Sequence, residues 1–199
     1  MTTASYYMEE QIEELKSWID ELSSHFEAGD YLLLQNEISN LPYIMEKAID
    51  AGVHIILNPS PMDQQVLDCP VKQVDYIILN EIEAAEICGL VGKIKDEQLA
   101  GKLAESFPHT KVILTLGEKG ALYLEKGNII RQESFHVPVV DTTAAGDTFT
   151  GYFFGSILSG MKPETALQRA AKAAAIAVTK KGAAPSIPEA LEVDGFFSE

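Results

Sequence analysis

The feature of this sequence that most constrains its fold is the alternation of short apolar runs with amphipathic segments. Apolar runs of strand length occupy 31–38, 53–58, 74–80 and 111–117. Segments with helical periodicity occupy 8–26, 42–51, 81–89 and 96–107. Continuous apolar strands that alternate with helices are typical of a parallel sheet covered on both faces. The sequence therefore predicts an α/β fold, a three-layer doubly wound domain with a mostly parallel sheet.

The pattern changes in the last third of the chain. Residues 120–140 alternate about a turn at 126–128, as an antiparallel hairpin would. Helices are predicted over 145–160 and 163–179. The second of these carries a face of small residues, Ala170, Ala171, Ala174, Ala175 and Val178. Such a face allows two helix backbones to approach closely.

Composition limits the classes of function. The chain has 199 residues, 46% of them hydrophobic, which predicts a single domain over 1–199. A formal net charge of −15 argues against nucleic-acid and anionic-membrane partners, since both need a basic surface. Cys69 and Cys88 have neither metal-ligand spacing nor a disulfide framework around them. With no apolar run of membrane length and no signal-peptide pattern, we expect a cytoplasmic protein.

Polar residues follow several of the predicted strands, where ligands bind in open parallel sheets. They are Asn58, then Asn80 and Glu83, then Thr115 and Gly117, and finally the motif DTTAAGDTF at 141–149. Each residue alone is typical of a turn or a helix cap. Together, at the same edge of the sheet, they indicate a binding crevice.

The motif at 141–149 is suited to holding an anion. Ala144, Ala145 and Gly146 have little or no side chain, so a ligand can approach their N–H groups at a helix start. Asp147 in the same turn has two interpretations. It is either an acidic residue that stabilises the first turn or a general base that takes a proton from a hydroxyl during phosphoryl transfer.

Six motifs in order resemble those of the ribokinase-like, or PfkB, carbohydrate kinases. They are LLLQNEI, NPSP, NEIEAAE, VILTLGEKG, DTTAAGDTF and AKAAAIAVTKKGAAPSIP. Within that family the likeness is strongest to ribokinases, through GAAPSIP and LLLQNEI. The resemblance implies the ribokinase-like fold and transfer of the γ-phosphoryl of ATP to a sugar hydroxyl, with ribose the favoured sugar.

The resemblance also implies a role for each matching residue. Asp147 is the base, and Ala144, Ala145, Gly146 and Asp147 form the anion hole. Asn80 and Glu83 organise Mg²⁺, while Thr115, Gly117 and Gly120 contact the nucleotide. Glu37 contacts the sugar. An activating K⁺ is expected near Asp141, Thr143, Gly182 and Ser186.

The chain departs from the family pattern at its N-terminal side. The family's first strands, its small lid and a sugar loop of the G-G-K-G type have no counterpart in the 199 residues. The sheet should then have an uncovered edge or apolar face, to be met by self-association, by an altered N-terminal helix or by a missing partner segment. An alternative function therefore stays open, that of a catalytically incomplete module for nucleotide binding or assembly.

Overall fold

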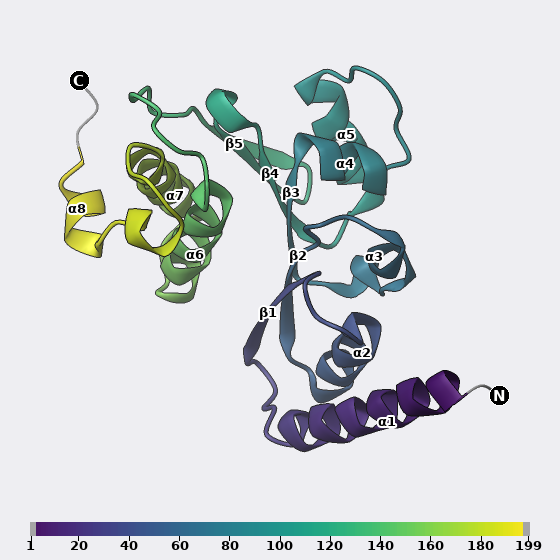
Figure 1. Cartoon of the computed structure of the whole chain (residues 1–199). Coiled ribbons are helices and arrows are strands. Elements are labelled where there is room, and N and C mark those ends of the chain that lie inside the picture. The colour runs from purple at the N-terminus through teal and green to yellow at the C-terminus, as the bar shows by residue number, and fades with distance from the viewer. Residues whose placement is uncertain (1–2, 197–199) are drawn as a thin grey trace. The chain divides into compact units, whose positions relative to one another are not determined.

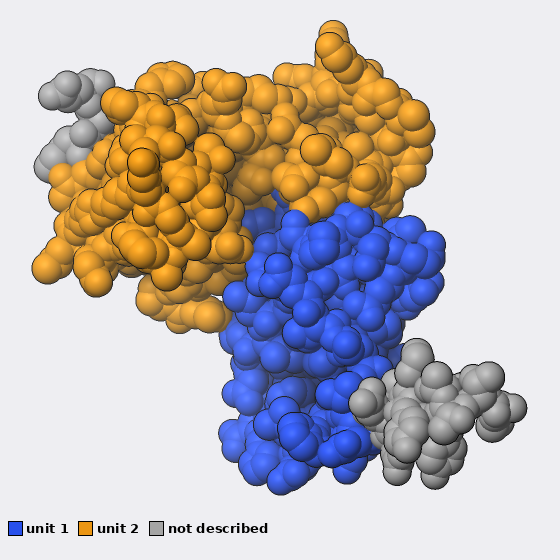
Figure 2. Space-filling model, viewed as in Figure 1, with its two compact units in different colours: residues 1–79 blue, residues 80–199 orange. Residues whose placement is uncertain are grey.

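The computed structural model describes residues 3–196, with side chains described from residue 13 onward. The backbone divides into two compact units, residues 1–79 and residues 80–199, which Figure 2 shows in two colours. Each unit is described by itself below. The prediction of a single domain stays a prediction.

The first unit is built on three parallel strands. They are β1 (Tyr31–Gln35), β2 (His54–Asn58) and β3 (Tyr76–Asn80), with Leu33 opposite Ile56 and Ile56 opposite Tyr76. The parallel pairing agrees with the prediction from continuous apolar runs. Strand β2 is buried at its three central residues, and β3 is buried up to Asn80, which is exposed.

Helices connect these strands. They are α1 (Thr3–Ser23), α2 (Leu41–Ala51), α3 (Gln64–Asp68) and the 3-10 turn η1 (Val71–Gln73). Helix α2 has a proline in its first turn and ends at Gly52, whose φ of 72° suits glycine. Its buried residues Leu41, Met45 and Ala48 lie at spacings of three and four. They form the apolar face that the periodicity predicted.

Helix α1 starts and ends earlier than the predicted 8–26. Its end has a local cause, because the hydroxyls of Ser23 and Ser24 donate to the carbonyl oxygens of Asp20 and Glu21. Serine competes in this way for backbone acceptors and favours helix termination. The apolar periodicity continues past Ser23 into a loop, so the predicted helix was too long at this end.

The second unit has three antiparallel strands between two layers of helices. Strands β4 (Lys111–Thr115), β5 (Ala121–Glu125) and β6 (Asn128–Gln132) pair in chain order. Helices α4 (Glu81–Ile87) and α5 (Asp96–Ser106) cover one face, and α6 (Ala145–Leu158) and α7 (Pro163–Val178) cover the other (Figure 1). The 3-10 turn η3 (Ala184–Ser186) and helix α8 (Ala190–Asp194) follow.

The predicted hairpin over 120–140 is too long in its second strand, which ends at Gln132. The chain then leaves the strand pair, and the N–H groups of Val140 and Asp141 both donate to the carbonyl of Val178, at 2.8 and 3.2 Å. The alternation of apolar residues over 133–140 therefore accompanies an extended segment whose last residues meet the end of α7. It does not reflect a strand.

Helices α6 and α7 pack against each other. Of the small face predicted on α7, Ala170, Ala171 and Ala175 are buried, while Ala174 and Val178 are half-buried. Phe153 on α6 is fully buried, and Ala170 and Ala173 on α7 have no exposed surface. Phe153 also contacts the rings of Phe149 and Phe154 on its own helix and of Tyr123 on β5. Among the described residues, no helix is long and apolar enough to cross a membrane.

Candidate active site

The first turn of α6 is the centre of the candidate site. Ala144 precedes the helix with φ 61° and ψ 9°, a left-handed conformation that is costly for a residue with a side chain. The carbonyl of Ala144 accepts from the N–H of Thr148 at 2.8 Å, and the N–H of Ala145 donates to Thr142 at 3.2 Å. Gly146 and Asp147 are exposed, so the turn presents backbone N–H groups and a carboxylate on one surface.

Asp141 fixes the loop before this turn. Its Oδ1 accepts from the backbone N–H of Thr143 at 2.9 Å and from the Thr143 hydroxyl at 2.7 Å. Its Oδ2 accepts from the N–H of Gly182, which is 41 residues away, at 3.0 Å. These donors, the Gly182 N–H first, lower the pKa of Asp141 to about 2. The carboxylate therefore links the segment just before α6 to the loop that follows α7.

Three of the four residues expected near K⁺ are brought together in this way. Gly182 has φ 88° and its loop leads into η3. Ser186 lies on the same loop, fully buried, with its hydroxyl donating to the carbonyl of Ala183 at 2.7 Å. Asp141 and the loop at 182–186 thus offer carboxylate and carbonyl oxygens, the ligands that hard cations prefer.

The loop after β4 is a closed turn. The 3-10 turn η2 (Gly117–Lys119) follows Leu116, whose N–H donates to the carbonyl of Gly120 at 2.8 Å. The N–H of Gly120 donates back to Gly117 at 3.1 Å. Gly120 has φ 95°, and a Cβ atom at this position would lie 2.0 Å from the carbonyl oxygen of Gln132. Glycine is therefore required here by both conformation and space.

Asn80 and Glu83 form a capping box at the start of α4. The Asn80 Oδ1 accepts from the N–H groups of Ile82 and Glu83, each at 2.9 Å, and the Glu83 Oε2 accepts from the Asn80 N–H at 3.0 Å. The N-x-x-E spacing is a known helix-start pattern, so the sequence carried this signal alongside the predicted role at Mg²⁺. The box orients both side chains at the carboxyl end of β3.

Glu37 belongs to the first unit, in an exposed position just after β1. Its neighbour Asn36 is buried, donates to the carbonyl of Pro61 at 2.6 Å and accepts from Gln65 Nε2 at 2.8 Å. The N–H of Ser60 donates to Asn58 Oδ1 at 3.2 Å. The two motifs LLLQNEI and NPSP are therefore linked by side-chain amides, a contact that the sequence pattern did not predict.

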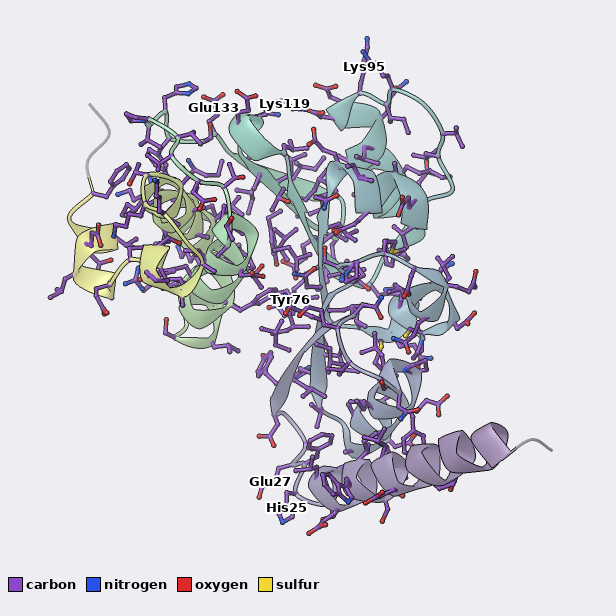
Figure 3. All side chains as sticks on the ribbon, viewed as in Figure 1. His25, Glu27, Tyr76, Lys95, Lys119 and Glu133 are labelled. Carbon is purple, nitrogen blue, oxygen red and sulfur yellow. The ribbon has the colours of Figure 1, made fainter. Side chains whose placement is uncertain are left out.

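A second feature that the sequence did not predict is the ammonium group of Lys119, which contacts Glu81 and Asp96 at 2.7 and 2.6 Å. Figure 3 shows Lys119 on the loop between β4 and β5. Metal ligation by side chains alone is not evident in the described part of the chain, which holds no cluster of three or more His, Cys, Asp or Glu suited to an ion.

Comparisons with known proteins agree with this geometry. Residues 7–190 match the model of the pfkB family of carbohydrate kinases. The chain is 40% identical over 175 residues to a ribokinase of Haemophilus influenzae, a match that covers 85% of this chain and 56% of that protein. It is 34% identical over 189 residues to a ribokinase of Schizosaccharomyces pombe, covering 92% of this chain and 59% of that protein.

Solved structures give the same result. The ribokinase of Thermotoga maritima superposes with a TM-score of 0.70 at 36% identity, over 83% of this chain and 55% of that one. A ribokinase of Arabidopsis thaliana, solved with ribose and ATP, gives 0.71 at 33% identity, over 82% of this chain and 54% of that one. The predicted ribokinase-like α/β fold is confirmed, and the chain spans little more than half the length of these relatives.

Proposed function

The chain belongs to the pfkB family of carbohydrate kinases, and we propose that it carries the nucleotide-binding and phosphoryl-transfer portion of an ATP-dependent sugar kinase. The observation that carries this proposal is the start of α6, where small residues and Asp147 occupy one exposed turn. Ribose is the favoured sugar, because ribokinases of two organisms align over most of this chain. A cytoplasmic location is part of the same proposal.

The turn at 144–147 supplies the anion site. The positive end of the α6 dipole and its first N–H groups stabilise the charge that spreads over the transferred phosphoryl group. Ala144 supports this geometry, because its left-handed conformation turns the chain into the helix. The N–H of Ala145 donates to the carbonyl of Thr142 at 3.2 Å, so a phosphoryl oxygen would replace that carbonyl as its acceptor, with a stronger charge-assisted bond.

Asp147 is the proposed general base. A carboxylate beside a phosphoryl group is unfavourable unless a hydroxyl lies between them. In the proposed reaction the Asp147 carboxylate takes the proton of the sugar hydroxyl as that oxygen bonds to the γ-phosphorus. The bond from phosphorus to the bridging oxygen breaks at the same time, and ADP leaves with that electron pair. Glu37 is proposed to hold other sugar hydroxyls.

The nucleotide is assigned to the loop after β4 and the start of α4. Thr115 ends β4, Gly117 and Gly120 lie in the closed turn that follows, and the capping box orients Asn80 and Glu83. Magnesium commonly takes one or two carboxylates and completes its shell with phosphates and waters. One carboxylate, Glu83, fits that pattern, and the ion would neutralise phosphate charge during transfer.

A monovalent cation is assigned to the place where Asp141 accepts a hydrogen bond from Gly182, beside the loop at 182–186. Both carboxylate oxygens of Asp141 accept hydrogen bonds, yet a carboxylate has about four lone-pair positions and retains acceptor capacity. Carbonyl groups of 182–186 would add oxygen ligands. Bound K⁺ would lower the electrostatic cost of placing phosphate at the nearby helix start.

A second candidate is a nucleotide-binding module without kinase activity. The observation in its favour is length, since the aligned relatives have many residues with no counterpart among the 199 of this chain. A site that fails to exclude water would hydrolyse ATP or react slowly with sugar. The two candidates share the nucleotide site and differ only in transfer to sugar.

The deciding experiment measures ADP release from Mg·ATP with and without ribose, in K⁺ and in Na⁺. Asp147→Asn should abolish ribose-dependent ADP release and leave nucleotide binding intact. Asp50→Asn on α2 is the matched control, since it removes one exposed carboxylate from a helix outside the candidate site. Nucleotide binding without ribose-dependent ADP favours the module. Full turnover in Asp147→Asn rules out the proposed base.

A further inference from the structure

The ammonium group of Lys119 joins three segments of the second unit that are separate in sequence. Its Nζ lies 2.7 Å from Glu81 Oε1 at the first residue of α4 and 2.6 Å from Asp96 Oδ1 at the first residue of α5. Lys119 itself ends η2. The two hydrogen bonds, the one with Asp96 first, raise the pKa of Lys119, so the group stays charged.

Two of these segments carry residues assigned to the nucleotide. Glu81 directly follows Asn80, which caps α4. Lys119 lies between Gly117 and Gly120, and its own N–H donates to the carbonyl of Leu116 at 3.0 Å. Lys119 therefore links this turn directly to the residue that follows the Asn80 cap.

The other side of the same turn is anchored to the chain after β6. The hydroxyl of Ser134 donates to the carbonyl of Glu118, and Gly120 packs against the backbone of Gln132 and Glu133. On the side facing α4 and α5, the contacts of Lys119 link the same turn to the first residues of both helices. A single exposed ion pair would contribute little to the spacing of the turn and these helices. Here one cation is shared by two carboxylates from different helices, so its position is restrained by both.

We propose that Lys119 is a positioning residue for the nucleotide: its contacts with Glu81 and Asp96 hold the turn at 117–120 at the correct distance from the Asn80 cap. This inference rests on the proposed function, because it concerns the same nucleotide site. It assigns no contact between Lys119 and the substrate, since both strong contacts of the ammonium are with protein carboxylates.

The test is a titration of Mg·ATP into the purified chain and its variants, with the thermal midpoint of each unliganded variant measured in parallel. Lys119→Met should weaken nucleotide binding by about three- to fivefold, a size set by the modest strength of exposed ion-pair contacts. Lys119→Arg should restore most of the affinity, because a guanidinium can contact two carboxylates at once. Lys102→Met is the matched control. It removes an ammonium from an exposed pair with Glu105 on α5 and should leave affinity unchanged.

A double-mutant comparison identifies the partner. If Lys119 acts through Glu81, then Glu81→Gln should weaken binding by itself, and adding Lys119→Met should cost less than it does in the wild-type chain. Independent effects of the two substitutions would overturn the proposal. So would an affinity in Lys119→Met equal to that of Lys102→Met.

The outcomes separate this inference from the proposed function. Nucleotide binding by the wild-type chain with no change in Lys119→Met overturns the positioning role alone. Failure of the wild-type chain to bind Mg·ATP overturns the proposed function, and the positioning role with it. A drop in thermal midpoint with unchanged affinity assigns Lys119 to stability only, which also contradicts the proposal.

Discussion

Replacing Gly120 by alanine should destabilise the protein more than any other glycine-to-alanine change in its loop. Gly120 has φ 95° and ψ −135°, a region that is almost confined to glycine and costs other residues about 1–3 kcal/mol. A Cβ atom there would also lie 2.0 Å from the carbonyl oxygen of Gln132 and 2.8 Å from two backbone atoms of Glu133. An ordinary contact between the Cβ atom and that carbonyl oxygen is well over an ångström longer. The backbone of Gln132 and Glu133, or that of residue 120, therefore has to move.

The cost of that movement can be estimated from what it displaces. Gln132 is the last residue of β6 and pairs with Ala121, so shifting it strains the end of the β5–β6 ladder. Forcing extra atoms into a packed position typically costs about 1–3 kcal/mol. Added to the conformational cost, Gly120→Ala should lose about 4 kcal/mol, a large part of the roughly 5–15 kcal/mol that stabilises typical proteins.

Two other glycines provide controls for the same chemical change. Gly117 has φ 55°, and a Cβ atom added there would have no neighbouring atom within 4 Å, so Gly117→Ala should cost about 1–2 kcal/mol from conformation alone. Gly101 lies within α5 with open space around it, so Gly101→Ala should stabilise by about 0.5–1 kcal/mol. Urea denaturation followed by circular dichroism measures all three. A loss in Gly120→Ala no greater than in Gly117→Ala would refute the steric argument.

Two further predictions concern the loop before α6. Ala144→Gly relieves a left-handed alanine at φ 61° and should raise stability by about 1 kcal/mol, seen as a thermal midpoint roughly 2–4 °C higher; an unchanged midpoint would contradict it. The pKa of Asp141 is lowered from 3.8 to about 2, so its contribution is present above the unfolded value and is lost as pH falls through the folded value. Urea midpoints should therefore fall between about pH 5 and pH 2 more steeply in the wild-type chain than in Asp141→Asn, and equal slopes would argue against this assignment.

The layout of helices and strands was predictable where a segment repeats its pattern over several turns. Helices α2, α5, α6 and α7 lie within a residue or two of the expected ranges, because a buried face requires spacings of three and four. Helix α3 was not predicted. Its five residues are too few to show periodicity, and its start depends on Asp63, whose side chain accepts from the Val66 N–H.

The candidate site was predictable to the extent that it is local in sequence. The Asp141–Thr143 contacts and the Asn80–Glu83 box each span two or three residues, so a motif records them. Contacts of Lys119 with Glu81 and Asp96 join positions 23 to 38 residues apart, which the sequence pattern does not record. The family resemblance predicted that Asp141 and Gly182 lie near the same K⁺. It did not predict the hydrogen bond between them.

The bond between Asp141 and Gly182 has a thermodynamic consequence for the two proposed ligands. Because one carboxylate contacts the approach to α6 and the loop after α7, opening either segment disturbs the other. Amide hydrogens of Thr143 and Gly182 should then exchange with solvent in the same opening event. Linkage is reciprocal, so whatever factor a cation at 182–186 adds to phosphate affinity, phosphate must add to cation affinity. If both proposed ligands bind, the carboxylate that orders the loop would couple their two binding equilibria.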